Sequence, residues 1–336
     1  MAFLMIIVGL ILFLKLVVVQ NLLFLMVFPD EITYGDNMNT DAWGDVANLS
    51  VYSLIPSNFG ITGARLFNSL ITSLCTIPIF YLFRKHHTER NSAILATVVS
   101  LFAPLWVYSF VNMTEALLFF GFLNAAVLRE SFAVNLSMGW LDAGKVSAFI
   151  NALVKPTGVA AYLVYLKYGF HIALLGGLVF ALTFGSPVPL EMQPINALIN
   201  IVRSVWYITF ASAGMAFFTG YRVATGQGDD DDKFAMGLLV MTFAIVFGFM
   251  FKLPHNKFYG RYFDAPILVV LTTALKPVKK DKMFKLAFAA CFVLALIYPV
   301  LTNFSESGGI LDAGLLSFYS AIKQVLWLSN PAFPQP

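Results

Sequence analysis

The sequence predicts an all-α polytopic membrane protein, a chain that crosses the bilayer many times. Of its 336 residues, 59% are hydrophobic and only 12% are charged, whereas soluble domains carry about 25% charged residues. Apolar runs of membrane-spanning length recur along the chain and alternate with short polar segments. A soluble fold has too little interior to bury this much apolar surface, so an assembly of soluble domains is excluded.

The first apolar run, 4–28, is expected to be a retained membrane span. It lacks a basic leading segment and is much longer than the core of a signal peptide. Lys15 lies near its middle. This lysine could pair with an acidic residue across the bundle, or the helix could begin later and let the side chain reach the interface. A polar loop, 29–60, follows.

Short polar segments divide the rest of the chain into further expected spans. The stretch 142–187 is apolar but is broken by "VKPTG" and "LKYGF", so it could hold two long spans or three short ones. The tail is mixed and could contain an interfacial helix near 311–328. The other expected spans are 61–83, 92–110, 113–128, 195–220, 234–252, 263–276 and 284–302.

Basic residues in short loops decide between these alternatives, because Lys and Arg are enriched on the cytoplasmic side. Two spans within 142–187 would put the lysine cluster at 276–282 outside, whereas three short spans put it inside. We therefore expect eleven spans, with the N-terminus in the cytoplasm. Residues 1–303 would form one transmembrane domain, and residues 304–336 an outer-face tail.

This topology brings several reactive polar segments to the outer face. The first follows the first span and reads "VFPDEITYGDN". Its adjacent carboxylates, Asp30 and Glu31, could supply a general base, bind a metal ion, or be ordinary loop polarity. Three later carboxylates of the same loop could assist, and nothing distinguishes among them: Asp36, Asp41 and Asp45.

Two ionisable residues lie where apolar runs meet the outer face. Glu115 lies just inside the fourth span and is a functional candidate, or it could favour the helix start together with Thr114. Lys155 precedes Pro156 in "FINALVKPTGVAAY". It could bind a phosphate or an anionic lipid headgroup, or reach the interface as a lysine at a helix end commonly does.

A basic segment, "PHNKFYGRYFDAPILVV", precedes the span 263–276. It carries His255, Lys257, Arg261 and Tyr262. A basic cluster on the outer face runs against the positive-inside trend and so indicates a function. Arginine is always charged and binds phosphate through two parallel hydrogen bonds. The segment therefore predicts a phosphate-binding site.

Other features indicate structure rather than chemistry. Cys75 and Cys291 lie in separate apolar runs and are expected to be small core residues without a disulfide or metal role. "GQGDDDDK", 226–233, is expected to be a solvated cytoplasmic loop, with a cation site as the alternative. The net charge of +3 carries no sign of a nucleic-acid partner.

Taken in order, five segments resemble the membrane glycosyltransferases of the GT-C fold that use polyprenyl-phosphate sugars, such as protein O-mannosyltransferases and lipid A aminoarabinose transferases. The segments are "PDEITY", "YSLIPSNFGITGARLFNSLITSLCTIPIFYLFRK", "APLWVYSFVNMTEALLFFGFLNAAVLRE", "NALVKPTGV" and "HNKFYGRYFDAPILVV". The resemblance covers about 25–270. It implies a GT-C-like bundle of about eleven transmembrane helices with a catalytic first outer loop.

The resemblance also implies roles for individual residues. Asp30 would deprotonate the acceptor with support from Glu31, and Arg261, with Lys155 as a second cation, would hold the lipid phosphate that leaves. Attack opposite that phosphate would invert the anomeric carbon. Four more residues would shape the cavity or contact the headgroup: Glu115, Arg65, His255 and Tyr262.

The expected function is therefore transfer of a sugar, such as mannose, from a polyprenyl-phosphate donor to a glycan, lipid or protein acceptor on the lumenal or outer face. The membrane would be a prokaryotic plasma membrane or the endoplasmic reticulum of a eukaryote. No cofactor is required by the sequence, although a divalent cation is an alternative at the Asp30–Glu31 pair. A transporter or flippase of lipid-linked sugars and a structural subunit of a membrane complex are the competing interpretations.

Overall fold

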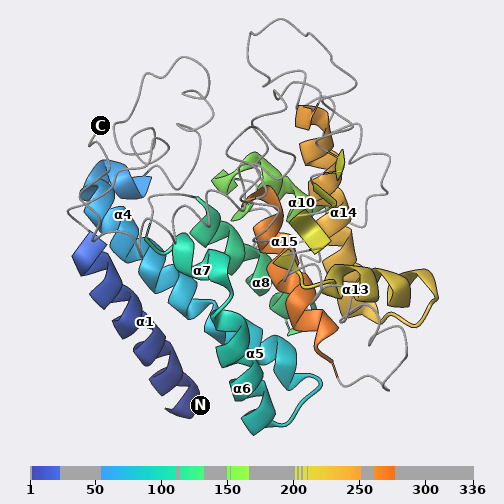
Figure 1. Ribbon diagram of the computed structural model, residues 1–336, viewed down its shortest axis with the longest axis horizontal. Helices are drawn as coiled ribbons and strands as arrows, with labels where there is room; N and C mark the ends of the chain where they lie inside the picture. Colours follow the sequence, from blue (N-terminus) through green and yellow to red (C-terminus); the bar gives the residue numbers. More distant parts are fainter. Residues whose placement is uncertain are drawn as a thin grey trace, which may run out of the picture.

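The computed structural model is a bundle of helices, and every element in the part of the chain that it describes is helical. From α1 (Ala2–Leu22) at one edge, the bundle passes through α8 (Glu115–Ser131) and α15 (Arg261–Ala274) to α14 (Asp230–Met250) at the other (Figure 1). The helical class is thus confirmed, whereas the number of membrane crossings stays a prediction. The structure describes residues 2–22, 54–110, 114–131, 150–165, 201–250 and 261–276, apart from 152, 203, 206 and 210.

Helix α1 has one buried face and one exposed apolar face. Leu4, Val8, Ile11 and Lys15 recur every three or four residues and are all buried, as expected for one stripe of a helix. The opposite face exposes large apolar side chains to the surroundings. These are Phe3, Met5, Ile6, Leu10, Phe13, Leu14 and Val17.

Lys15 is fully buried and bonds to neutral groups. Its Nζ donates to Thr72 Oγ1 at 2.9 Å and to the Leu105 carbonyl oxygen at 3.2 Å, and lies 5.3 Å from the centre of the Trp106 ring. The helix begins before Lys15, so the expectation of a later helix start is wrong. Among the described residues, the contacts of this ammonium are with a hydroxyl, a carbonyl and a ring instead of a carboxylate. Lys15 thereby joins α1 to two other parts of the bundle.

The expected span 61–83 corresponds to α4 (Leu54–Leu74) followed by α5 (Thr76–Arg84). Residues 54–60 are helical, so the expected loop 29–60 ends earlier than predicted. Gly60 has a φ of 67° and kinks α4, a conformation that glycine adopts without steric cost. Beyond the kink, Thr62–Arg84 is the one helix of the described residues that is long and apolar enough to cross a bilayer.

The expected span 92–110 is two helices in the structure, α6 (Glu89–Ser100) and α7 (Ala103–Val107). Thr88 begins α6 by accepting a hydrogen bond from the Asn91 N–H. Pro104 explains the break, because its ring nitrogen cannot donate to the carbonyl four residues earlier. That carbonyl, on Ser100, accepts a hydrogen bond from Trp106 Nε1 at 3.0 Å instead.

Proline and glycine also interrupt the later helices. Residues 150, 151, 153 and 154 are helical and are followed by the 3₁₀ turn η2 (Pro156–Gly158) and by α10 (Val159–Tyr165). The expected span 195–220 is broken at 212–214, where Ala213 and Gly214 have φ values of 47° and 72°, before α13 (Met215–Ala224) begins. The expected span 234–252 is confirmed as helical by α14.

Helix α15 lies between other helices on every side. It contacts α14, α8, α13, α5 and α6, and its central residues, Ile267 to Val270, have no exposed surface. A helix that is apolar around its whole circumference is stable only when protein or lipid surrounds it, and here other helices do so. Its two ends therefore meet the two polar regions of the bundle.

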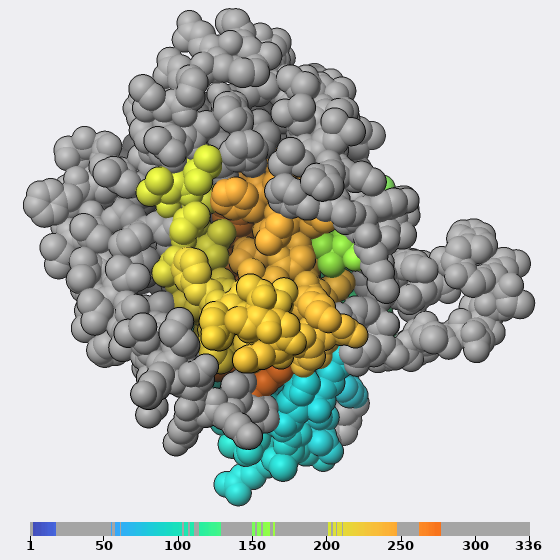
Figure 2. Space-filling model, turned by 90° about the vertical axis from the view of Figure 1, so that its right-hand side faces the viewer, coloured from blue at the N-terminus to red at the C-terminus, as the bar shows by residue number. Residues whose placement is uncertain are grey.

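One polar region, which we call the charge cluster, joins the end of α15 to α5, α13 and α14. Figure 2 shows α13 and α14 on one face with α5 and α6 beneath them. Arg222 Nη2 donates to Asp232 Oδ1 at 2.6 Å and to the Thr273 carbonyl at 3.2 Å, and His87 Nε2 lies 2.9 Å from the Leu275 carbonyl oxygen. The charge cluster comprises Lys85, His86, Arg222, Asp229, Asp231, Asp232 and Lys276.

The expectation that the acidic run is a solvated loop is wrong for part of it. Asp230 is exposed, but the Asp231 and Asp232 side chains are only 10% and 3% exposed. Asp229 Oδ1 accepts from the Asp232 N–H at 2.9 Å, and Asp232 Oδ2 accepts from the Asp229 N–H at 3.3 Å, which is a capping box at the start of α14. Burial would raise the pKa of Asp229, but hydrogen bonds from Lys276 and Asp232 outweigh it and hold this pKa below its usual value.

We expect Asp232→Ala to lower the free energy of unfolding by about 3 kcal/mol, because it leaves the buried Arg222 guanidinium without its carboxylate partner. Thermal denaturation of the purified protein measures the loss. Asp230→Ala in the same run is the control. Its side chain is 81% exposed, so a change within about 0.5 kcal/mol is expected. Equal losses in the two variants would contradict a buried structural role for Asp232.

Candidate functional site

The predicted residues Lys155 and Glu115 form a buried ion pair. Lys155 directly follows the helical segment that ends at Val154, because Pro156 stops the α-helix. Glu115 is the first residue of α8. Lys155 Nζ donates to Glu115 Oε1, and the two side chains are only 11% and 2% exposed. The second carboxylate oxygen of Glu115 accepts from the Thr114 hydroxyl at 3.2 Å. Glu115 is therefore the ion-pair partner of the Lys155 ammonium, in addition to any favourable effect at the start of α8.

Tyr262 completes this group from a third segment of the sequence. It is the second residue of α15, and the centre of its ring lies 4.9 Å from Lys155 Nζ. A cation at this distance from an aromatic face is attracted to it. Three residues singled out from three separate motifs are thus in contact, and we call them the ion-pair site: Glu115, Lys155 and Tyr262.

Close packing holds the two halves of the ion-pair site together. A Cβ atom placed on Gly121 of α8 would lie 1.7 Å from Asn151 Oδ1. Any larger residue at this position would push the segment that carries Lys155 away from α8, so the absence of a side chain at Gly121 permits the ion pair to form.

A second polar group lies on the same turn of α15 and was not predicted. The Asp264 carboxylate accepts a hydrogen bond from the Tyr108 hydroxyl at 3.1 Å through one oxygen, and from the Tyr207 hydroxyl through the other. Asp264 is 1% exposed and lies within electrostatic reach of Glu115 and Lys155. The signal was present, because an acidic residue within an expected membrane span is a functional candidate by default.

The first turn of α15 is thereby attached to several helices. Tyr108 follows α7 and packs against Phe119 of α8, with ring centres 5.6 Å apart, and Tyr207 lies in the helical residues 207–209. Pro266 lies inside α15 and cannot donate the helical hydrogen bond to the Tyr262 carbonyl. We call Asp264, Tyr108 and Tyr207 the tyrosine–aspartate group. It fixes the turn on which Tyr262 lies.

Most of the remaining predicted site residues fall outside the part of the chain that the structure describes. Asp30, Glu31 and His255 lie outside the described residues, as does the side chain of Arg261, although Arg261 begins α15. Arg65 is buried in α4 with 4% of its surface exposed. Because Arg261 directly precedes Tyr262, its backbone lies at the ion-pair site.

One group of described side chains is spaced closely enough to hold a metal ion, but ammonium groups already pair with its carboxylates. His86, Asp229 and Asp231 bring ligand atoms within 4.8 Å of one another at the charge cluster. However, Lys276 Nζ bonds to both oxygens of Asp229, and Lys85 Nζ bonds to Asp231 Oδ1 at 3.2 Å. These ammonium groups already neutralise the carboxylates, and they would repel a divalent cation.

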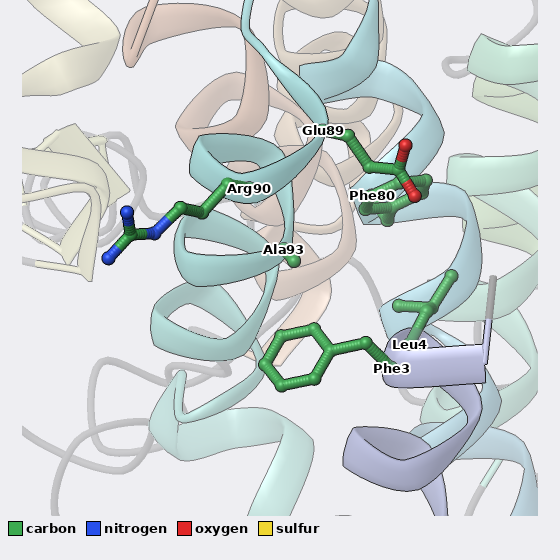
Figure 3. Close-up of a pocket in the computed structure, with 6 residues that line it drawn as sticks. All are labelled: Phe3, Leu4, Phe80, Glu89, Arg90 and Ala93. Atoms are coloured by element: carbon green, nitrogen blue, oxygen red, sulfur yellow. The ribbon is translucent and has the colours of Figure 1, made fainter.

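A separate cavity of about 440 Å³ lies between α1, α5 and α6, and no residue of the ion-pair site or of the tyrosine–aspartate group lines it (Figure 3). Its wall is almost wholly apolar, and the Arg90 side chain points away from the other lining residues. None of the predicted site residues lines it. The lining residues are Phe3, Leu4, Phe80, Glu89, Arg90 and Ala93.

We expect Tyr207→Phe to lower the free energy of unfolding by about 1.5–3 kcal/mol, because it removes one of two hydrogen bonds to a buried carboxyl group. Thermal denaturation measures this, with Tyr221→Phe as the control. Tyr221 is 38% exposed and should tolerate the change. A loss as large at Tyr221 as at Tyr207 would show that Asp264 does not depend on its tyrosine partners.

Comparison with known proteins gives no relative from which a function could be transferred. No protein-family model matches the chain, and no curated protein or solved structure matches it either.

Proposed function

We propose that this chain is an integral membrane glycosyltransferase that takes a sugar from a polyprenyl-phosphate donor. The observation that carries the proposal is the contact of Lys155 with Glu115 and Tyr262. These residues come from three of the segments that resemble the GT-C enzymes, and they are far apart in the sequence. A buried, oriented ammonium beside the start of α15, where Arg261 lies, is suited to a phosphate group.

Apolar surface supports the location in a membrane. Besides Thr62–Arg84, three shorter helical segments are apolar: Phe3–Val17, Glu115–Leu128 and Tyr262–Ala274. The outward face of α1 consists of large apolar side chains, which lipid would cover better than water. In this proposal the chain has eleven spans and lies in a prokaryotic plasma membrane or the endoplasmic reticulum.

The chemistry assigned to each residue follows from the charge that develops in the reaction. Asp30, supported by Glu31, would remove the proton from the acceptor hydroxyl. Negative charge grows on the lipid phosphate as the glycosidic bond breaks, and Arg261 and Lys155 would stabilise it. An ammonium has three donors, and Glu115 is the one hydrogen-bond acceptor of Lys155 Nζ among the described residues. A phosphate oxygen could therefore bind without displacing Glu115.

A transporter or flippase of lipid-linked sugars is the second candidate. Glu115 and Asp264 are 2% and 1% exposed, and buried carboxylates inside a membrane bundle are typical of ion and substrate pathways. The two functions differ at Asp30. A transferase needs this carboxylate to break a bond, whereas a flippase moves the donor across the membrane unchanged.

We expect Asp30→Asn to reduce sugar transfer by at least about 100-fold, because the amide cannot accept the acceptor proton. Release of sugar from dolichyl- or undecaprenyl-phosphate donors in proteoliposomes measures this, with an acceptor pool present. Asp230→Asn, at an exposed position in the acidic run, is the control and should keep full activity. Sugar transfer by Asp30→Asn at the wild-type rate would contradict the role of Asp30 as general base. Donor movement between leaflets without any transfer in the wild type would favour the flippase.

Binding of the donor phosphate gives a separate prediction. We expect the double variant Lys155→Met with Glu115→Gln to weaken binding of polyprenyl phosphate by about 10- to 100-fold, the effect of losing a charge-assisted hydrogen bond. The glutamine avoids leaving a buried carboxylate unpaired. Arg261→Ala should weaken binding as well. Lys233→Met is the control, because this lysine is 60% exposed and lies near the start of α14, beside the charge cluster. Unchanged affinity in the double variant would argue against a phosphate at Lys155.

A further inference from the structure

Buried threonine hydroxyls in the described part of the chain fall into two groups. Most have a partner within the fold, as Thr272 Oγ1 does in donating to the Val269 carbonyl at 2.6 Å. Thr157, Thr219 and Thr242 instead have buried hydroxyl oxygens with no hydrogen-bond partner among the described residues. Native interiors pair nearly all of their buried polar atoms, so each exception calls for a ligand, a water molecule or another explanation.

Thr157 differs from an ordinary helical threonine in its backbone. It is the middle residue of η2, where the Gly158 N–H donates to the Lys155 carbonyl at 2.8 Å in a 3₁₀ turn. A threonine in a helix can donate to a carbonyl three or four residues earlier, as Thr272 does, although Thr219 and Thr242 do not. The turn interrupts that register, and the Thr157 hydroxyl forms no such bond although the residue is only 4% exposed.

The position of Thr157 separates it from the other two. It lies two residues after Lys155, so their Cα atoms are at most about 7 Å apart. Thr219 lies on α13 and Thr242 on α14, and neither helix contributes a residue to the ion-pair site. Of the three threonines, Thr157 is therefore the one whose backbone lies close to that of the proposed phosphate-binding lysine.

We infer that the Thr157 hydroxyl binds a hydroxyl group of the sugar attached to the lipid phosphate, and so contributes to the choice of sugar. The inference rests on the proposed function. It adds a residue that would contact a sugar hydroxyl, a role that none of the sequence motifs assigns. A threonine hydroxyl can donate to or accept from a sugar hydroxyl. A site built to bond a substrate hydroxyl rejects the analogue without it, because the protein group is then left unpaired.

Stability of the unliganded protein gives the first test. Thr157→Val keeps the shape of the side chain and removes the hydroxyl. Because an unpaired buried hydroxyl is a net cost to folding, we expect the melting temperature to stay unchanged or to rise by roughly 2–4 °C. Thr272→Val is the matched control, since it removes a buried hydroxyl that has a partner, and its melting temperature should fall.

Substrate selectivity gives the second test. Polyprenyl-phosphate sugars that each lack one hydroxyl are compared with the complete sugar in the wild type and in Thr157→Val. For one of these donors we expect a roughly tenfold loss of kcat/KM in the wild type and no further loss in Thr157→Val. Thr157→Ser keeps a hydroxyl and should keep the wild-type discrimination. Thr272 lies ten residues beyond Tyr262, about 15 Å along α15, so Thr272→Val should also discriminate as the wild type does.

The outcomes separate this inference from the proposed function. If the wild type transfers sugar and Thr157→Val discriminates among the donors just as the wild type does, the sugar-binding role fails while the transferase proposal stands. A raised melting temperature with unchanged selectivity means that the hydroxyl is unpaired but does not contact the sugar, which overturns the inference. A lowered melting temperature shows a structural partner and overturns it as well. If the wild type uses no lipid-linked sugar, the proposed function fails, and the inference fails with it.

Discussion

The burial of α15 on every side is the constraint on which the rest of the structure depends. A helix with no solvent-facing side cannot carry an unpaired charge, so each polar residue on it must meet a partner from another helix. At one end, Asp264 bonds to Tyr108 and Tyr207, and Tyr262 lies beside Lys155. At the other end, the Thr273 carbonyl accepts from Arg222 of the charge cluster. The same helix that closes the core therefore brings the ion-pair site together.

Helix breaks have as large a part in the site as helices do. Pro156 ends the helical turn that carries Lys155, so the lysine lies where the chain changes direction and can meet Glu115 at the start of α8. Pro104 separates α7 from α6, and Tyr108 follows the short helix that results. In both places, a residue that cannot donate a backbone hydrogen bond creates the irregular segment from which a polar side chain contacts the bundle interior. Non-helical backbone at membrane depth is tolerated where protein surrounds it, so both breaks are compatible with the proposed membrane location.

The sequence predicts the helical class and several helix positions because apolar runs are long and their polar boundaries are distinct. It also identifies Glu115, Lys155 and Tyr262, since ionisable and aromatic residues at the ends of apolar runs are few. It does not predict their contact, or the partners of Asp264, because Tyr108 is 156 residues and Tyr207 is 57 residues away from Asp264 in the sequence, and no local pattern joins them. The acidic run shows the same limit. Four consecutive aspartates predict a solvated loop, and only the contacts with Arg222 on α13 and with Lys276, 44 residues away, explain why Asp232 is buried.

A comparison of Lys15 with Lys155 shows why Lys155 is the better ligand-binding candidate. The Lys15 ammonium is enclosed by a hydroxyl, a carbonyl and an indole ring, and these groups fill the space around it in an otherwise apolar stripe of α1. Its contacts attach one helix to two others, which is a structural role. Lys155 is 11% exposed, has one carboxylate acceptor among the described residues, and lies two residues before Thr157, whose buried hydroxyl has no partner among them. Burial alone therefore does not identify a functional lysine. What distinguishes Lys155 is that its ammonium and the nearby Thr157 hydroxyl can form more hydrogen bonds than they form within the described fold. In the proposed function, a phosphate-linked sugar would form these additional bonds.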